Sequence, residues 1–243
     1  MCWGAPLDDK EKNVKRAISC IKAGHGRVME YVDVELVISD VSARCLRELY
    51  THIGGAPTRL QASTRYISEQ SGFDYYTPPK IENNMGCKQM FTEGMGTIQK
   101  VYNGLLEEGM TKEDVLYRTK ADLKVVNFVV GMNKLKAFEI PNEDVTNLLP
   151  LAYQSKMVWK VNLRTLINFM NRRLCMRALR EIRDLSVEIK DRLAEKNEEW
   201  AWIAENLFVP TCEQYKYRNP NLVFCPEQQC CGKHKKIEQL EIG

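Results

Sequence analysis

Asn162-Leu163-Arg164-Thr165-Leu166-Ile167-Asn168-Phe169-Met170 opens the longest periodic segment of this chain, which extends to Ala204. Apolar residues recur in this segment mostly three or four positions apart, which is the spacing of one apolar face of an α-helix. We therefore predict a helical segment over residues 162–204, with a break near Asn197. The apolar stripe consists of Leu163, Leu166, Ile167, Met170, Leu174, Ala178, Ile182, Leu185, Ile189 and Leu193.

Arginines stand out on this helical segment. At 100° per residue, Arg173 and Arg177 fall on the same side as the apolar stripe, whereas Arg172 and Arg180 lie towards its flank. A charge on the apolar side must be paired, hydrated in a cleft or used in a site. The spacing favours a buried ion pair and a functional role about equally for Arg173 and Arg177, and a solvated face for the other two.

The rest of the chain mixes helical and strand-like patterns. Residues 28–38 are rich in valine and partly alternate, which predicts a strand, and Tyr75 to Pro79 is expected to be a loop or edge segment ended by proline. Helical patterns cover residues 8–23, 42–52 and 88–108, and helix openings are expected at 111–114 and at the start of 141–160. This mixture predicts an α/β fold with one domain over 1–207, followed by a cysteine-containing tail over 208–243.

A second arginine-rich stretch, Pro57-Thr58-Arg59-Leu60-Gln61-Ala62-Ser63-Thr64-Arg65-Tyr66, follows Gly54 and Gly55. Arginine offers a planar fork of donors, hydroxyls add short hydrogen bonds, and glycines allow close backbone approach. These groups suit a bound phosphate. The chain has no G-x-G-x-x-G after a strand, no Walker-type loop and no G-x-S-x-G elbow, so the common nucleotide folds are not indicated.

Composition narrows the class of protein. The chain has 243 residues and a formal net charge of +3, which is too small to indicate duplex DNA or RNA as a general partner. Its apolar runs are shorter than the roughly 20 residues that span a bilayer, and the N-terminus lacks a basic-then-apolar signal pattern. We therefore expect a cytoplasmic protein that binds neither nucleic acid nor membrane.

Three ordered stretches resemble motifs of the flavin-dependent thymidylate synthase family. The stretch from Gly24 to Tyr31 is similar to the family's Gly-His-x-x-x-x-Glu-His turn, and Ser63-Thr64-Arg65-Tyr66 is similar to its Ser-x-Arg-Tyr. The helical segment from Asn162 to Arg173 resembles its Asn-x-Arg-x-x-x-x-Phe-x-x-x-Arg pattern. The resemblance covers roughly residues 10–205.

This resemblance implies a fold, an assembly and a reaction. The fold is a mixed central sheet wrapped by helices, and the assembly is a homotetramer whose active sites combine several subunits. The reaction takes a methylene from methylenetetrahydrofolate, reduces it through FAD at the expense of NADPH, and places the methyl group on C5 of dUMP to give dTMP. No enzyme nucleophile is needed.

The resemblance also implies roles for individual residues. Ser63 and Arg65 match positions that hold the dUMP phosphate, and Arg173 matches the catalytic arginine beside the uracil. Residues expected to bind substrate are Gln61, Ala62, Ser63, Thr64, Arg65 and Arg173. Residues expected to bind the cofactor are His52, Arg59, Gln61, Asn162, Arg164, Asn168 and Arg177.

The chain departs from the family pattern in places. The family's Arg-His-Arg triplet falls near residues 52–55, where this chain has His52-Ile53-Gly54-Gly55, and we expect Arg59 to supply the missing charge from a different place. The arginine expected before the Leu-Pro pair is Thr146, and the histidine expected after Glu30 is Tyr31. These changes keep two alternatives open: a related flavin-dependent C5 modification, such as hydroxymethylation of dUMP or another pyrimidine nucleotide, or an inactive binding protein.

The C-terminal tail carries clustered metal-ligand types. Cys212, Cys225, Cys230, Cys231 and His234 lie within it, but their spacing matches no common zinc pattern and lacks a C-x-x-C. Free or loosely packed thiols are therefore favoured over a structural metal, although the sequence leaves zinc open, and no metal is assigned to the catalytic site.

Overall fold

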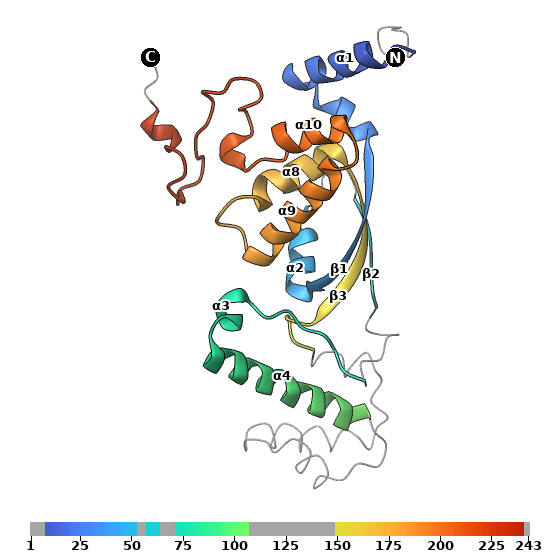
Figure 1. Cartoon of the computed structure of the whole chain (residues 1–243), viewed down its shortest axis with the longest axis vertical. Helices are drawn as coiled ribbons and strands as arrows, with labels where there is room; N and C mark the ends of the chain where they lie inside the picture. The colour runs from blue at the N-terminus through green and yellow to red at the C-terminus, as the bar shows by residue number, and fades with distance from the viewer. Residues whose placement is uncertain (1–7, 53–56, 64–70, 107–148, 241–243) are drawn as a thin grey trace. The chain divides into compact units, whose positions relative to one another are not determined.

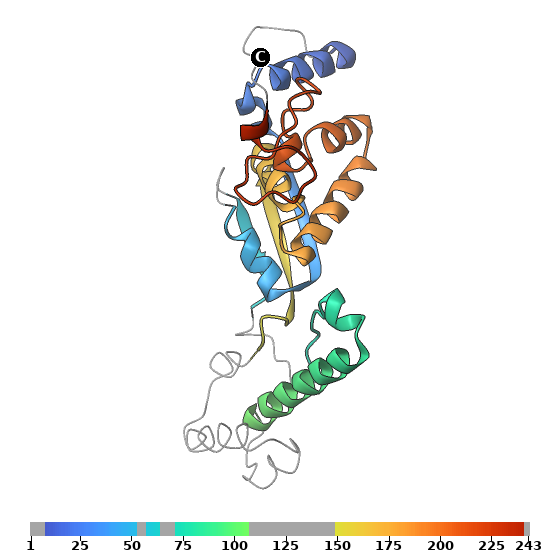
Figure 2. The ribbon, with the colours of Figure 1, turned by 90° about the vertical axis from the view of Figure 1, so that its left-hand side faces the viewer.

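The structure is a computed structural model that describes residues 8–52, 57–63, 71–106 and 149–240 (Figure 1, Figure 2). By its internal contacts the chain divides into two compact units. The first comprises Met1–Leu36, Glu48–Arg59 and Trp159–Gly243, and the second comprises Val37–Arg47 and Leu60–Val158. Helices and strands occur together, as the α/β prediction requires.

A sheet of three strands has the order β1-β3-β2, with β1 at Asp33–Ser42, β2 at Thr58–Gln61 and β3 at Gln154–Asn162. Near one end of the β1–β3 pair, the backbone N–H of Leu163 donates to the carbonyl of Val32 over 2.7 Å. Near the other end, the side chain of Gln154 donates to the carbonyl of Asp40 over 3.4 Å, so β1 and β3 run antiparallel.

Strand β3 corrects the expectation for residues 141–160, whose opening had indicated a helix. Its side chains alternate, with Ser155, Met157, Trp159 and Val161 buried and the residues between them exposed. That period of two is typical of a strand with one face in the core. The expected helix opening itself lies outside the described residues, as do the helix start at 111–114 and residues 122–133.

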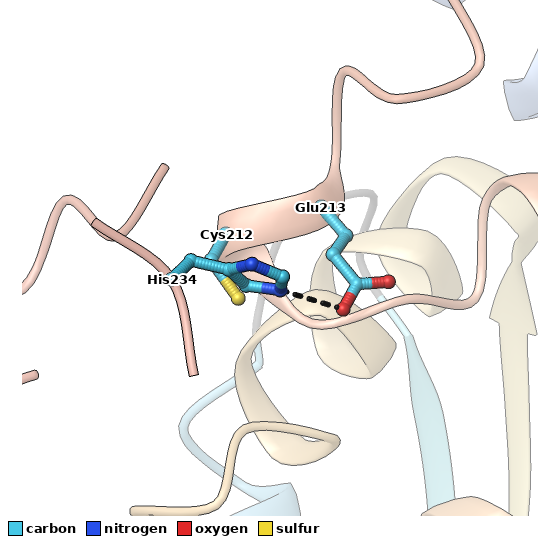
Figure 3. Close-up of side chains that lie close together, drawn as sticks. All are labelled: Cys212, Glu213 and His234. Carbon is cyan, nitrogen blue, oxygen red and sulfur yellow. Dashed lines mark hydrogen bonds and ion pairs between the residues drawn. The ribbon is translucent and has the colours of Figure 1, made fainter. Parts of the chain in front are cut away.

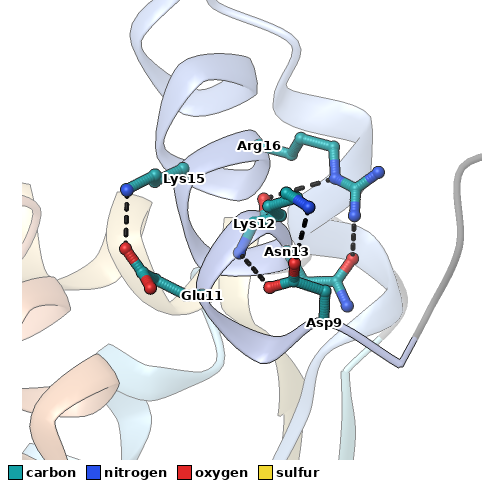
Figure 4. Close-up of polar contacts among 6 residues, drawn as sticks. All are labelled: Asp9, Glu11, Lys12, Asn13, Lys15 and Arg16. Carbon is teal, nitrogen blue, oxygen red and sulfur yellow. Dashed lines mark hydrogen bonds and ion pairs between the residues drawn. The ribbon is translucent and has the colours of Figure 1, made fainter.

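Helices of the first unit largely follow the predicted periodicity. Helix α1 is Lys10–Lys22, as expected for residues 8–23, and the Asp9 side chain caps it by accepting the N–H of Lys12 over 2.9 Å. Pairs one turn apart add to its stability, as between Glu11 and Lys15 at 2.6 Å (Figure 4). The strand expected from Val28 is wrong at its start, because Gly26–Tyr31 forms a 3-10 helix, η1, that packs against α8.

The long periodic segment forms three helices, which lie close together in Figure 1. They are α8 at Leu163–Arg173, α9 at Arg180–Ala194 and α10 at Glu198–Asn206. The break near Asn197 is confirmed, because the Asn197 side chain caps α10 by accepting the N–H of Trp200 over 2.8 Å. Helix α8 ends at Arg173, and this break was not predicted. Because the helix ends there, Arg177 does not lie on the helix that carries Arg173.

Aromatic side chains form the centre of the first unit. Trp159 and Phe169 are fully buried, with their ring centroids 5.2 Å apart in an edge-to-face arrangement. Phe169 also meets the ring of His52 edge to face at 5.0 Å. This contact joins helix α8 to the segment that follows helix α2, Ala43–Leu49.

The second unit has its own small core. Phe73, Met95 and Tyr153 are buried together, and Tyr75 and Phe91 pack against them. Tyr75 pairs with Tyr153 in an isolated β-bridge, so the expectation of an edge segment there is confirmed. Helix α3 at Pro79–Glu82 leads into α4 at Met85–Leu106, which begins three residues before the predicted start.

The tail is joined to the core of the first unit at its beginning. Phe208 is fully buried, and the Asn171 side chain donates to the carbonyls of Leu207 and Val209 over 3.1 and 2.6 Å. The hydroxyl of Thr211 donates to the carbonyl of Asn171 over 2.9 Å. The division at residue 207 stays a prediction, although these contacts fix the first residues of the tail. Among the described helices, none is long and apolar enough to cross a membrane.

We expect Phe169→Ala to lower the free energy of unfolding by about 3–5 kcal/mol, because it leaves a cavity against Trp159 and His52. Denaturant unfolding followed by circular dichroism measures this loss. Met90→Ala, at a side chain that is 74% exposed, is the control and should change stability by less than about 0.5 kcal/mol. Equal effects of the two substitutions would contradict the described core.

Candidate functional site

The turn that ends helix α2 is held by arginine. The guanidinium of Arg59 donates through Nη2 to the carbonyls of Leu49 and His52, and it lies over the ring of Tyr50 at 5.0 Å. Carbonyls at a helix C-terminus have no partner within the helix and carry partial negative charge, so a cation stabilises them. Arg59 is therefore next to His52, although its Nη2 already binds the backbone.

Arg173, the last residue of helix α8, reaches the same turn. Its Nη1 lies 2.9 Å from Oε2 of Glu48, and its Nη2 donates to the Thr51 hydroxyl over 3.0 Å. Its Nε donates to Nε2 of His52 over 3.1 Å. Its side chain is only 17% exposed. A guanidinium with three side-chain partners has little rotational freedom, so its position is set before any ligand arrives.

His52 is uncharged at neutral pH. Burial, followed by the nearby charges of Arg173, Arg172 and Arg59, lowers its pKa from 6.5 to about 4. The neutral ring can accept the Arg173 hydrogen bond at Nε2, which assigns the ring proton to Nδ1. The histidine thus orients Arg173 without adding a second positive charge.

A cavity of about 540 Å³ lies next to this cluster within the first unit, a size typical of small-ligand sites. It is lined by Thr51, His52, Arg172, Arg173, Cys175, Arg177, Ala178, Thr211 and Glu227. Three guanidinium groups against one carboxylate give the lining a positive balance, which suits an anionic ligand.

The cavity is lined by some of the predicted site residues and by others that were not predicted. His52, Arg173 and Arg177 line it together, with Arg177 placed by the turn after α8 rather than by the predicted helix face. Arg172 is exposed, as expected for a solvated face, yet it also lines the cavity. Thr51, Thr211 and Glu227, which line the cavity, and Glu48, which pairs with Arg173, were missed because only tertiary contacts bring them close to the predicted residues.

Two other predicted cofactor residues, Asn162 and Arg164, lie at the opposite end of helix α8, and Asn168 lies midway along it. Asn162 is its N-cap and accepts the N–H of Thr165 over 2.9 Å, whereas Asn168 is exposed. Arg164 forms an ion pair with Glu30 at 2.5 Å. At 1.5 Å per residue, Arg164 is about 14 Å along the helix from Arg173. Asn162 and Arg164 thus form a second polar region, separate from the cavity.

The predicted nucleotide stretch is described in part. Gln61 ends strand β2, and the N–H of Ala62 donates to the carbonyl of Lys156 over 2.9 Å. Ser63 is exposed. Thr64 and Arg65 lie outside the described residues, so their assignments remain predictions.

Known proteins of one family are similar to this chain over most of its length. The family described as "Thymidylate synthase complementing protein" matches residues 1–197. A flavin-dependent thymidylate synthase of Clostridium tetani is 28% identical over 242 residues, covering 97% of this chain and 84% of that protein. One of Nitratidesulfovibrio vulgaris is 30% identical over 175 residues, covering 72% of this chain and 61% of that protein.

A solved structure shows the same fold. The flavin-dependent thymidylate synthase of Helicobacter pylori, determined with FAD and dUMP, has a TM-score of 0.51 and 19% identity. The match covers 85% of this chain and 89% of that one. The mixed α/β fold is thus that of a flavin-dependent thymidylate synthase. The chain belongs to this family of enzymes, as a divergent member at modest identity.

The low pKa of His52 predicts a pH dependence of stability. Between pH 6.5 and about 4 the unfolded chain binds a proton that folded His52 does not, so stability is lost as the pH falls through this window. The full effect is at most roughly 3 kcal/mol at 1.36 kcal/mol per pKa unit.

Denaturant unfolding of wild type and His52→Gln at pH 7 and pH 4.5 measures this effect. Other titrating groups act on both proteins, so the difference between the two proteins isolates His52. The advantage of the wild type should shrink or reverse at the lower pH. Two curves that fall in parallel would contradict the neutral, buried histidine.

Proposed function

We propose that this enzyme methylates dUMP at C5 to give dTMP, with methylenetetrahydrofolate as the carbon donor and NADPH as the reductant. FAD, when bound, supplies the hydride chemistry of this reaction. The observation that carries the proposal is the fixed guanidinium of Arg173 at a cavity of nucleotide size, in a chain that belongs to this family. The relative from Helicobacter pylori, solved with FAD and dUMP, supports these ligands.

The donor chemistry of the described residues fits anionic ligands of this kind. Arg172, Arg173 and Arg177 line the cavity, and Arg172 and Arg177 are exposed at its edge. At the other polar region, the contact of Arg164 with the described residues is the one from Nη1 to Glu30, so its other donors can meet a pyrophosphate. We assign His52, Arg59, Asn162, Arg164, Asn168 and Arg177 to the flavin, together with Gln61.

Arg173 would act on the pyrimidine. A fixed cation beside the uracil ring stabilises negative charge that develops on the ring, and this raises the nucleophilicity of C5. Glu48, Thr51 and His52 would keep the guanidinium in place while the ring charge changes, so little reorganisation is needed. In the same proposal, Ser63 and Arg65 hold the phosphate of dUMP, assisted by Gln61, Ala62 and Thr64.

One observation supports an alternative reaction product. Arg59 stands where it could replace the charge of the family's Arg-His-Arg triplet, but its Nη2 binds the carbonyls of Leu49 and His52. Arg59 therefore offers a ligand fewer free donors than the triplet would. A related C5 modification, such as hydroxymethylation, or a different pyrimidine nucleotide is the alternative. The family resemblance further supports a homotetramer in the cytoplasm.

We expect Arg173→Ala to lower kcat about 100- to 1,000-fold, because it removes a charge that acts in the transition state. The assay is chromatographic and mass-spectrometric analysis of products from dUMP, dCMP or UMP, with FAD, NADPH and methylenetetrahydrofolate supplied. Arg180→Ala is the matched control, since that side chain is 60% exposed and pairs with Asp184.

Unchanged kcat in a folded Arg173→Ala protein would rule out the proposed role. Thymidylate as the sole product of the wild type would exclude the alternative chemistry, whereas hydroxymethyl-dUMP would establish it.

We expect Arg65→Ala to raise KM for dUMP about 10- to 100-fold with a smaller effect on kcat, because a charge-assisted hydrogen bond to phosphate acts mainly in binding. Steady-state kinetics with varied dUMP measure this split. Arg192→Ala, whose side chain is 76% exposed, is the control. A fall in kcat at unchanged KM would contradict a phosphate-binding role.

A further inference from the structure

The tail of the chain gathers metal-ligand side chains around a small cavity that the proposed reaction does not use. Cys175, Cys212, Cys225, Cys230, Cys231 and His234 all line it. Its volume of about 20 Å³ is close to the space that one water molecule or ion occupies. Thiols and imidazoles are preferred ligands of a soft or borderline metal ion. Among the described residues, Cys212, Glu213 and His234 form the one such group whose ligand atoms all lie close together.

One side of this cavity already has the geometry of a histidine ligand with its orienting acid. Ligand atoms of Cys212, Glu213 and His234 lie within 4.8 Å of one another (Figure 3). Nε2 of His234 is 3.0 Å from Oε1 of Glu213, and the same oxygen binds Nζ of Lys233 at 2.7 Å. A carboxylate that holds one ring nitrogen fixes the ring so that the other nitrogen can meet a metal.

The other side is a pair of neighbouring thiols held by backbone contacts. The thiol of Cys230 donates to the carbonyl of His234 over 3.3 Å. The N–H of Gly232 donates to Sγ of Cys230 over 3.3 Å, and Gly232 has a φ of +85°, which favours glycine. Cys225 bridges to Lys236, so it is held beside the segment that carries His234.

The tail has little apolar core of its own. Across residues 210–240, all of them described, Cys225 is the only buried side chain. Segments with so little apolar core commonly depend on a metal or a disulfide for their structure. Thiolate and imidazole ligands in a closed four-coordinate set select zinc over hard cations such as magnesium.

We propose that Cys212, Cys225, Cys230 and His234 bind one structural Zn²⁺, with Glu213 as the residue that positions His234. Arg177 and Lys233 line the same cavity and would offset the negative charge of three thiolates around the ion. The proposed ion itself would take no part in the methylation chemistry. Glu227 lines both this cavity and the arginine-lined one, so the two lie next to each other.

This metal would also hold one wall of the arginine-lined cavity. Nη1 of Arg177 donates to the carbonyl of Gln229 over 3.0 Å, between the proposed ligands Cys225 and Cys230. Fixing those two cysteines fixes the loop that carries this carbonyl and Glu227. Zinc removal should therefore loosen Arg177 as well as the tail.

The test is the metal content of the full-length protein, purified without chelator or affinity metal and measured by inductively coupled plasma mass spectrometry. We expect about one zinc per chain. Co²⁺ in place of zinc should give the visible bands of a tetrahedral site and a sulfur-to-metal charge-transfer band. Cys212→Ser and Cys230→Ser should lose the ion, whereas Cys87→Ser, at an exposed residue of helix α4, should keep it.

Glu213→Gln separates the positioning role from ligation. It should retain zinc with an affinity that is about 10- to 100-fold weaker, as for other residues that orient a metal ligand. Complete loss of zinc in this variant, with loss of the tetrahedral Co²⁺ spectrum, would instead make Glu213 a ligand and overturn the assigned set.

A readout on the wild type avoids dependence on variants that fail to fold. In the zinc-loaded protein, alkylation followed by mass spectrometry should modify Cys231 and Cys87 but not Cys212, Cys225 or Cys230 until a chelator is added. Wild-type protein that takes up no zinc, with all these thiols alkylated or with Cys225 and Cys230 joined as a disulfide, would overturn the proposal. Neither result depends on methylation activity.

Discussion

The interaction on which the site depends is the docking of Arg173 onto the turn that ends helix α2. One guanidinium binds Glu48, Thr51 and His52, and so joins the C-terminus of helix α8 to a segment more than 120 residues earlier in the chain. The arrangement works because His52 is neutral: burial and the surrounding arginines lower its pKa to about 4. A protonated histidine would repel Arg173 and lose the acceptor at Nε2.

Local signals in the sequence predicted the elements that local forces determine. Helix α1 has an aspartate cap and helical spacing, and helix α10 begins at a capping asparagine, so both were predicted within a few residues. Residues 28–31 were wrongly predicted as strand, because the prediction rested on the valine content of the whole stretch 28–38, whereas residues 26–31 form a 3-10 helix that packs on α8. No glycine or proline marks the break between Arg173 and Arg180, so local sequence signals could not predict it.

The site was predicted in part, for a comparable reason. Arg173 stood out because a charge on an apolar stripe needs a partner, and the structure supplies that partner in Glu48. The partners themselves, and the contribution of Thr211 and Glu227 from the tail, depend on contacts far apart in the sequence. Arg177 reaches the cavity through the turn after α8, although the helical face that suggested it does not exist. The tail is thus part of the site rather than an addition to it.

The central proposal is that this enzyme holds a flavin and a pyrimidine nucleotide together in one active site, with Arg173 beside the pyrimidine. The most direct test is the visible absorbance spectrum of the purified protein, recorded with added FAD and then with dUMP. We expect the protein to retain flavin and dUMP to shift the flavin bands, because the two ligands share one site. Protein that retains no flavin with FAD in excess, or a flavin spectrum that dUMP leaves unchanged, would contradict the claim.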